Sequence, residues 1–169
     1  MRNLPGFPFF GSVKEDWKQH LLSQDLIYVG GGNTRSMLAL WREWGVDEVL
    51  LDAYDQGIIL SGNSAGSICW FEQGITDSVA PLGVIDCMGL IQGSCCPHYD
   101  MEAEHRPAFL EKAQSKEALP GIALEDNTAA HYINGELKQI VTEVSGKRAF
   151  WLDAAREKEM DVYDLCSVD

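Results

Sequence analysis

The sequence lacks any apolar run close to the roughly 20 residues that a membrane-spanning helix requires, so we expect no membrane association. Basic residues are also scarce, because 13 Lys and Arg stand against 26 Asp and Glu and give a net charge of −13 at pH 7. A surface this acidic repels phosphate backbones, which argues against a nucleic-acid partner. No internal repeat or low-complexity tract is present. The 46% hydrophobic content suits one domain over residues 1–169.

The N-terminus also lacks the apolar core of a secretion signal. Residues 1–12 read MRNLPGFPFFGS, so we expect an irregular segment over 1–20, a candidate short helix over 16–23 and a cytoplasmic protein. Five cysteines are present, an odd number, and the adjacent pair Cys95 and Cys96 has no CxxC partner. We therefore expect free thiols and no structural zinc site.

The apolar pattern predicts strands that alternate with helices. Short β-prone runs at 26–29 and 57–61 each enter a glycine-rich turn. Helix-compatible segments follow at 35–44 and 46–56, and another follows the second turn through Phe71. This rhythm is typical of a parallel sheet with helices on its faces.

The second half of the chain continues the pattern with shorter elements. The predicted elements are a strand led by 90–91, a helix over 107–116, strands at 121–124 and 148–152, a hairpin around Asn134 and Gly135, and a charged tail over 154–169. We expect the tail to be a frayed helix or disordered.

The second glycine-rich turn is a candidate nucleophile site. Residues 62–66 read GNSAG and fit G-x-S-x-G, in which a serine occupies a strained turn between a strand and a helix. Flanking glycines let the backbone pass close, and the helix N-terminus favours negative charge that develops during a reaction. Ser64 is the predicted nucleophile. The alternative is an ordinary strand-to-helix turn in which the serine only caps the helix.

A serine hydroxyl needs a base, and the chain has four histidines. His98 follows a strand and a Cys-Cys-Pro turn, which predicts a place at a strand's carboxyl end. His20 falls in a surface helix, His105 stands among charged residues where we expect solvent, and His131 opens a hairpin strand. His98 is therefore the best candidate base by position.

Two acidic residues are candidates for the carboxylate that would orient the base. Glu125 and Asp126 follow the strand predicted at 121–124. Because side chains alternate along a strand, only one of them should face the site. Both residues also fit the polar segment that ordinarily follows a strand, so the pattern alone does not decide which of them, if either, orients the base.

These motifs together resemble peptidase family S51, the group that contains aspartyl dipeptidase (peptidase E) and cyanophycinase. The matching pieces are VGGGNT at 29–34, GNSAG at 62–66, PH at 97–98 and GIALED at 121–126. The likeness covers about residues 21–152. The glycine loop and the serine turn make a specific combination, and CWF at 69–71 with TDS at 76–78 looks like an uncharacterised bacterial peptidase E-like branch.

The resemblance implies a three-layer α/β fold like class I glutamine amidotransferase domains, with a mostly parallel sheet and helices on both faces. It also implies a serine peptidase that cleaves small peptides, including dipeptides with an N-terminal acidic residue, without metal or organic cofactor. The implied roles are Ser64 as nucleophile, His98 as general base, Asp126 as acid with Glu125 as the alternative, Gly32 and Ala65 as oxyanion-hole N–H donors, and Asn33 as a loop-holding, substrate-binding residue.

Two features depart from the family's pattern. Members usually carry one or two strand–helix units before the glycine loop, whereas about 25 residues precede Leu26 here. We therefore expect a chain short at its N-terminus, or a sheet with an open edge that a homodimer would cover. The residues that select an acidic substrate are not clearly matched. Arg106 could pair a substrate carboxylate, although a surface ion pair with Glu102 is the favoured interpretation.

Other functions fit parts of the pattern. Glutamine amidotransferase-like chemistry uses a cysteine where Ser64 stands, and Cys69 is expected in the core. An esterase would share the triad, and a decayed or truncated homologue would keep the fold as a binding or assembly module. Nucleotide binding is disfavoured, because the glycine loop has neither a Gly-Lys-Ser/Thr motif nor G-x-G-x-x-G spacing.

Overall fold

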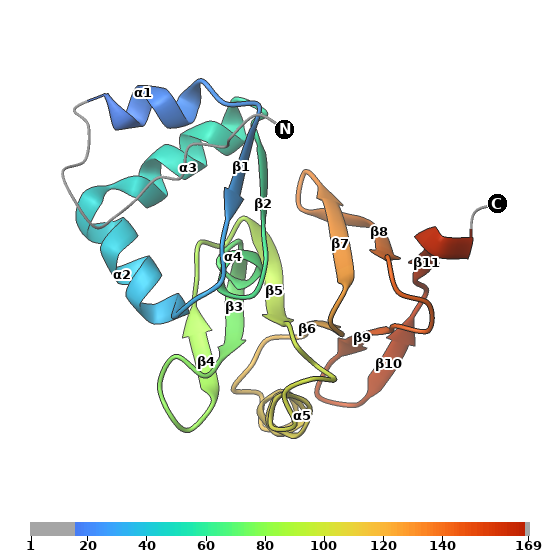
Figure 1. Ribbon diagram of the computed structural model, residues 1–169. Helices are drawn as coiled ribbons and strands as arrows, with labels where there is room; N and C mark the ends of the chain where they lie inside the picture. Colours follow the sequence, from blue (N-terminus) through green and yellow to red (C-terminus); the bar gives the residue numbers. More distant parts are fainter. Residues whose placement is uncertain (1–15, 168–169) are drawn as a thin grey trace.

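The computed structural model describes residues 16–167 (Figure 1). The first part of this range forms a helical unit around two parallel strands, in which Leu26 pairs with Ile59 and Val29 pairs with Gly62. Its elements are α1 (Trp17–Leu22), β1 (Leu26–Val29), α2 (Thr34–Trp44), α3 (Val46–Asp55) and β2 (Ile59–Gly62). Helix α4 (Ala65–Ile68) follows β2 after a single turn.

A six-stranded sheet forms the centre of the molecule. Its strands in spatial order are β10 (Glu157–Met160), β9 (Ala149–Leu152), β6 (Gly121–Leu124), β5 (Ile91–Cys96), β3 (Phe71–Thr76) and β4 (Gly83–Asp86). The central strands β6, β5 and β3 run parallel, whereas β4, β9 and β10 pair antiparallel at the edges. Parallel central strands bring their carboxyl ends to one edge, where loops can gather functional side chains.

A smaller three-stranded sheet lies beside the central one (Figure 1). It contains β7 (Thr128–Ile133), β8 (Glu136–Thr142) and β11 (Tyr163–Asp164), and a short 3-10 helix at Leu165–Ser167 follows. The hairpin between β7 and β8 turns at Asn134 and Gly135, both with positive φ, as the sequence predicts.

Helices cover both faces of the central sheet. Helix α5 (His105–Gln114) buries Phe109 on one face, in a cluster with Ile75 and Leu152. Helix α4 presses on the opposite face, where a Cβ on Gly74 of β3 would fall 1.8 Å from the Ile68 side chain. The β7–β8 hairpin covers the rest of that face. The predicted α/β class with helices on both faces is therefore confirmed.

Three predictions from the sequence differ from the structure. The helix after the second glycine turn ends at Ile68, and Phe71 begins β3 instead of closing that helix. The segment expected to be irregular over 1–20 contains the start of α1 (Trp17–Leu22), which confirms the candidate short helix over 16–23, and residues 1–15 lie outside the described residues. The tail contributes β10 and β11 rather than a frayed helix or disorder. None of the helices between residues 16 and 167 is long and apolar enough to cross a membrane.

Candidate active site

The turn between β2 and α4 holds Ser64 in a conformation that L-residues rarely adopt. Its backbone has φ 54° and ψ −122°, and α4 begins at the next residue. A Cβ on Gly62 would lie 2.5 Å from the carbonyl oxygen of Val29, and one on Gly66 would lie 2.1 Å from the same atom. Glycine at both positions therefore lets the end of β1 pack directly against the turn, as G-x-S-x-G predicts.

The glycine loop after β1 runs alongside the serine. A Cβ on Gly31 would lie 3.2 Å from Ser64 Cβ and 3.6 Å from Ser64 Oγ. Among the described residues, the backbone N–H groups of Gly32 and Ala65 donate to no other backbone carbonyl outside regular helices and strands. Ala65 directly follows Ser64, and Gly32 directly follows Gly31, the residue of the loop that lies against the Ser64 side chain.

Asn33 holds this loop in place through both ends of its side chain. Its Oδ1 accepts a hydrogen bond from Ser36 N at 2.9 Å, which caps α2, and its Nδ2 donates to the Ser78 carbonyl at 3.0 Å. The amide is therefore engaged within the protein. This arrangement supports the loop-holding role expected for Asn33, and its substrate contact stays a prediction.

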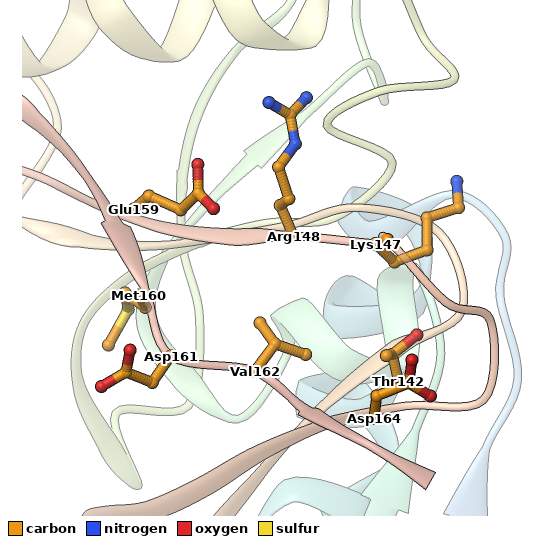
Figure 2. Close-up of a pocket in the computed structure, with 9 residues that line it drawn as sticks. Thr142, Lys147, Arg148, Glu159, Met160, Asp161, Val162 and Asp164 are labelled. Carbon is orange, nitrogen blue, oxygen red and sulfur yellow. The ribbon is translucent and has the colours of Figure 1, made fainter. Parts of the chain in front are cut away.

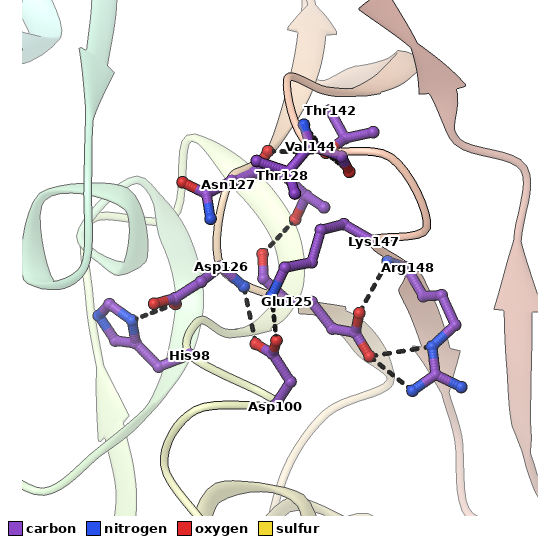
Figure 3. Close-up of polar contacts among 10 residues, drawn as sticks. All are labelled: His98, Asp100, Glu125, Asp126, Asn127, Thr128, Thr142, Val144, Lys147 and Arg148. Atoms are coloured by element: carbon purple, nitrogen blue, oxygen red, sulfur yellow. Dashed lines mark hydrogen bonds and ion pairs between the residues drawn. The ribbon is translucent and has the colours of Figure 1, made fainter. Parts of the chain in front are cut away.

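His98 and Asp126 meet at the carboxyl ends of β5 and β6 (Figure 3). The distance from His98 Nδ1 to Asp126 Oδ1 is 2.6 Å, and the two side chains are about one-third exposed. His98 has φ 56°, a left-handed conformation that turns its ring out of the strand direction. An ionised carboxylate can only accept, so in this contact the imidazole proton would lie on Nδ1 and the lone pair on Nε2.

Glu125 points to a different partner. Its Oε1 accepts from Arg148 Nε at 3.0 Å and from Nη2 at 2.8 Å, while Oε2 accepts from Arg148 N at 2.9 Å. The Glu125 side chain is only 5% exposed. Of the two acidic candidates, the structure therefore brings Asp126 to His98 and pairs Glu125 with Arg148, the residue just before β9.

Helix α4 connects the two halves of the site. Ser67, one turn after the nucleophile candidate, donates to the Ser64 carbonyl at 2.7 Å, and α4 packs against β5, the strand that contains Cys95. Cys95 stands three residues before His98. The turn with Ser64 and the loop with His98 are therefore joined through neighbouring parts of α4 and β5.

His105 and Arg106 differ from the expectations of the sequence. His105 is buried rather than solvated, with Nδ1 2.7 Å from the Pro97 carbonyl and Nε2 2.6 Å from a carboxylate oxygen of Glu102. Arg106 pairs with Glu157 at 2.6 Å and not with Glu102. The charged neighbours of His105 in the sequence led to the wrong prediction that its side chain is exposed. The residues that contact it, Pro97 and Glu102, lie in the preceding loop.

The cysteines do not offer a second nucleophile near the turn. Burial raises the pKa of the Cys69, Cys95 and Cys96 thiols well above the usual value, and burial raises that of Cys87 to about 12. A thiol reacts as the thiolate, so Cys69 has little reactive form at neutral pH. This observation weighs against amidotransferase-like chemistry at Cys69. Residues 16–167 contain no group of three His, Cys, Asp or Glu side chains arranged to hold a metal.

A shallow pocket of about 390 Å³ lies away from these residues (Figure 2). It opens between the β8–β9 connection and the β10–β11 segment, and its lining includes Lys147, Arg148 and Asp161. Ser64 and His98 do not line it. Lys147 and Arg148, which line this pocket, also form the ion pairs with Asp100 and Glu125.

The fold and this site define an α/β protein whose candidate nucleophile follows a strand of the β1–β2 pair and whose candidate base follows β5 of the central sheet. The model of peptidase family S51 matches residues 6–140, and the chain belongs to that family. The uncharacterized peptidase YgaJ of Bacillus subtilis (strain 168) is 45% identical over 141 residues, which are 83% of this chain. The chain spans 61% of the length of that relative.

A solved structure is also similar to the chain. It is a 1.5 Å crystal structure from Listeria monocytogenes EGD-e, named as a peptidase E protein, with 19% identity and a TM-score of 0.48. The similarity covers 85% of this chain and 62% of the other. The family assignment rests on the family model and on the relative from Bacillus subtilis.

Proposed function

We propose that this chain carries the catalytic site of a serine peptidase that hydrolyses peptide bonds of small peptides. The observation that carries the proposal is the 2.6 Å contact between His98 Nδ1 and Asp126 Oδ1 beside β5. Membership of peptidase family S51 and the 45% identity to a relative named as a peptidase support the same reaction class.

In the proposed mechanism, His98 Nε2 takes the proton from the Ser64 hydroxyl as Oγ attacks the carbonyl carbon of the peptide bond. Asp126 keeps the other imidazole proton on Nδ1 and stabilises the imidazolium that forms. His98 then gives the proton to the leaving amine, and the acyl group stays on Ser64. Water, deprotonated by His98, attacks that ester and releases the acid.

The backbone N–H groups of Gly32 and Ala65 would stabilise the negative oxygen of the tetrahedral intermediate. Support comes from the closeness of the glycine loop to Ser64, since a Cβ on Gly31 would touch the serine side chain. Loss of one such donor typically lowers the rate by about a hundredfold or more. Because these donors are backbone N–H groups, a side-chain substitution at Gly32 or Ala65 does not remove them and tests them only indirectly.

A fluorophosphonate probe tests the nucleophile directly, because it labels only an activated serine. The wild-type chain should be labelled and Ser64→Ala should not. Ser61→Ala, on β2 three residues earlier, is the matched control and should keep full labelling. Labelling that is absent from the wild type, or equal in Ser64→Ala, would contradict the proposal and favour a binding or assembly module.

Substrate class is tested separately from the nucleophile. We expect turnover of small peptides, with dipeptides that carry an N-terminal aspartate as the first candidates, and weak or no turnover of p-nitrophenyl esters of long acids. Mass spectrometry of a dipeptide panel with Ser64→Ala as blank gives the comparison. Turnover of esters without any turnover of peptides would favour the esterase alternative.

The cytoplasmic location and the homodimer remain predictions. One face of the β1–β2 pair exposes Leu26, Tyr28 and Ile59, whose exposed fractions are 48%, 58% and 60%. Apolar groups gathered on an open face are typical of surfaces that associate. Sedimentation equilibrium of the chain gives its mass in solution and so tests the dimer.

A further inference from the structure

We propose that Asp100, held by Lys147, is a positioning residue that fixes Asp126 against His98. The inference rests on the proposed function, because it concerns the acid of the proposed triad. Neither Asp100 nor Lys147 touches His98 in the structure. Their effect would therefore act through the backbone of Asp126.

The Asp100 carboxylate contacts two other segments, the turn that contains Asp126 and the β8–β9 connection that contains Lys147 (Figure 3). Its Oδ1 accepts a hydrogen bond from the backbone N–H of Asp126 at 2.8 Å, and its Oδ2 forms an ion pair with Lys147 Nζ. The Asp100 and Lys147 side chains are 22% and 20% exposed, so both are largely packed. One carboxylate thus links the loop after β5, the turn after β6 and the connection between β8 and β9.

This link is important because Asp126 lies beyond the end of β6. The strand ends at Leu124, and the turn that follows includes Asn127 with φ 66°. Tyr99 N donates to the Leu124 carbonyl at 3.1 Å, which ties the His98 loop to the last residue of the strand. The bond from Asp100 extends that tie to Asp126 itself, so it sets the position from which the carboxylate reaches His98.

Charge pairing at this end of the sheet supports the arrangement. Three carboxylates lie close in the chain or in space, and each has its own partner: Asp100 with Lys147, Glu125 with Arg148 and Asp126 with His98. Because Lys147 neutralises Asp100, the hydrogen bond to Asp126 N forms without leaving an unpaired negative charge beside the triad.

Substitutions at Asp100 separate a positioning role from a structural one. Asp100→Ala removes the acceptor, so we expect the maximal rate of fluorophosphonate labelling of Ser64 to fall about tenfold with the half-saturating concentration unchanged. Asp100→Asn keeps an oxygen acceptor and should recover most of the rate. Lys147→Met should lower the rate in the wild type and add nothing in Asp100→Ala, because it acts through Asp100.

A second readout does not depend on activity. The imidazole of His98 is titrated by NMR, with its signal assigned by comparison with His98→Gln. In this NMR experiment, Asp100→Ala should move the midpoint of the His98 signal to lower pH, because a displaced Asp126 stabilises the imidazolium less. Asp100→Asn should stay close to the wild type. The other charged pair next to His98, Glu102 with His105, is the same in both variants.

The outcomes distinguish the two proposals. An unchanged His98 titration in Asp100→Ala, or an equal shift in Asp100→Asn, overturns the positioning role and leaves the proposed function standing. If the wild type is not labelled but the His98 titration shifts as expected, the proposed function fails and the positioning role stands. Glu117→Ala, which breaks the exposed Lys112–Glu117 pair, is the control for loss of an ordinary ion pair.

Discussion

The two halves of the candidate site are held together by different kinds of contact. The half that contains Ser64 is made of backbone and glycine, with the Val29 carbonyl packed between Gly62 and Gly66. The half that contains His98 and Asp126 is made of charged side chains that bind one another across three segments. The first half should therefore be sensitive to added atoms, and the second to lost charges and to pH.

The largest expected effect breaks the charged half at its centre. Asp126→Asn removes the charge that stabilises the His98 imidazolium and allows the wrong tautomer, so the labelling rate of Ser64 should fall about a thousandfold or more. The rate is measured by quenching the fluorophosphonate reaction at a series of times and quantifying the labelled protein. Asp161→Asn, an exposed site on the β10–β11 connection, is the control and should label like the wild type. A fall of less than tenfold in Asp126→Asn would contradict the assignment of the acid.

Much of the glycine half could be predicted from the sequence, because its determinants are local. The strand at 26–29 is a short apolar run that has the same bounds in the structure. The serine turn follows from its glycines. Steric requirements of this kind involve residues close in the chain, and a sequence displays them directly.

The charged half depends on contacts between distant residues, and the sequence shows less of it. The choice between Glu125 and Asp126 depends on Arg148, which lies 23 residues further on. Burial of His105 depends on the Pro97 carbonyl and on packing of α5. Strand β10 reads EKEM and has no apolar pattern, because its place at the sheet edge is set by pairing with β9.

The next largest effect breaks the glycine half. In Gly66→Ala, the new methyl group would overlap the Val29 carbonyl, so we expect the free energy of unfolding to fall by about 3 kcal/mol or more. Gly30→Ala is the matched control, because nothing lies within 4 Å of a Cβ there. Urea denaturation of both variants gives the comparison. Equal stability of the two variants would contradict the proposed packing of β1 against the turn.

A smaller effect tests the anchoring of Glu125. Arg148→Ala leaves the buried Glu125 carboxylate with one backbone donor, so the free energy of unfolding should fall by about 2 kcal/mol. The labelling rate per folded molecule should change little, because Glu125 does not touch His98. Arg35→Ala, at an exposed position on α2, is the control for stability. A large loss of labelling without loss of stability would point to a direct catalytic role for the Glu125–Arg148 pair.

The smallest expected effect concerns pH. Burial would raise the pKa of Asp100, but hydrogen bonds from Lys147 and from backbone N–H groups outweigh it, so the net pKa is lowered. A carboxyl with a lower pKa in the folded state adds stability that is present above about pH 4 and is lost as pH falls through the folded-state value. Urea midpoints should favour the wild type over Asp100→Asn at pH 6, and the gap should be smaller at pH 3. A gap that is the same at both values would contradict this.

The contact between β1 and the serine turn also restricts how the site can move. The Val29 carbonyl lies so close to Gly62 and Gly66 that the strand and the turn can neither slide past each other nor separate without loss of packing. Ser64 and the loop expected to hold the oxyanion thus behave as one rigid body. Any widening of the site must then come from the loops that carry His98 and Asp126, which ion pairs hold in place.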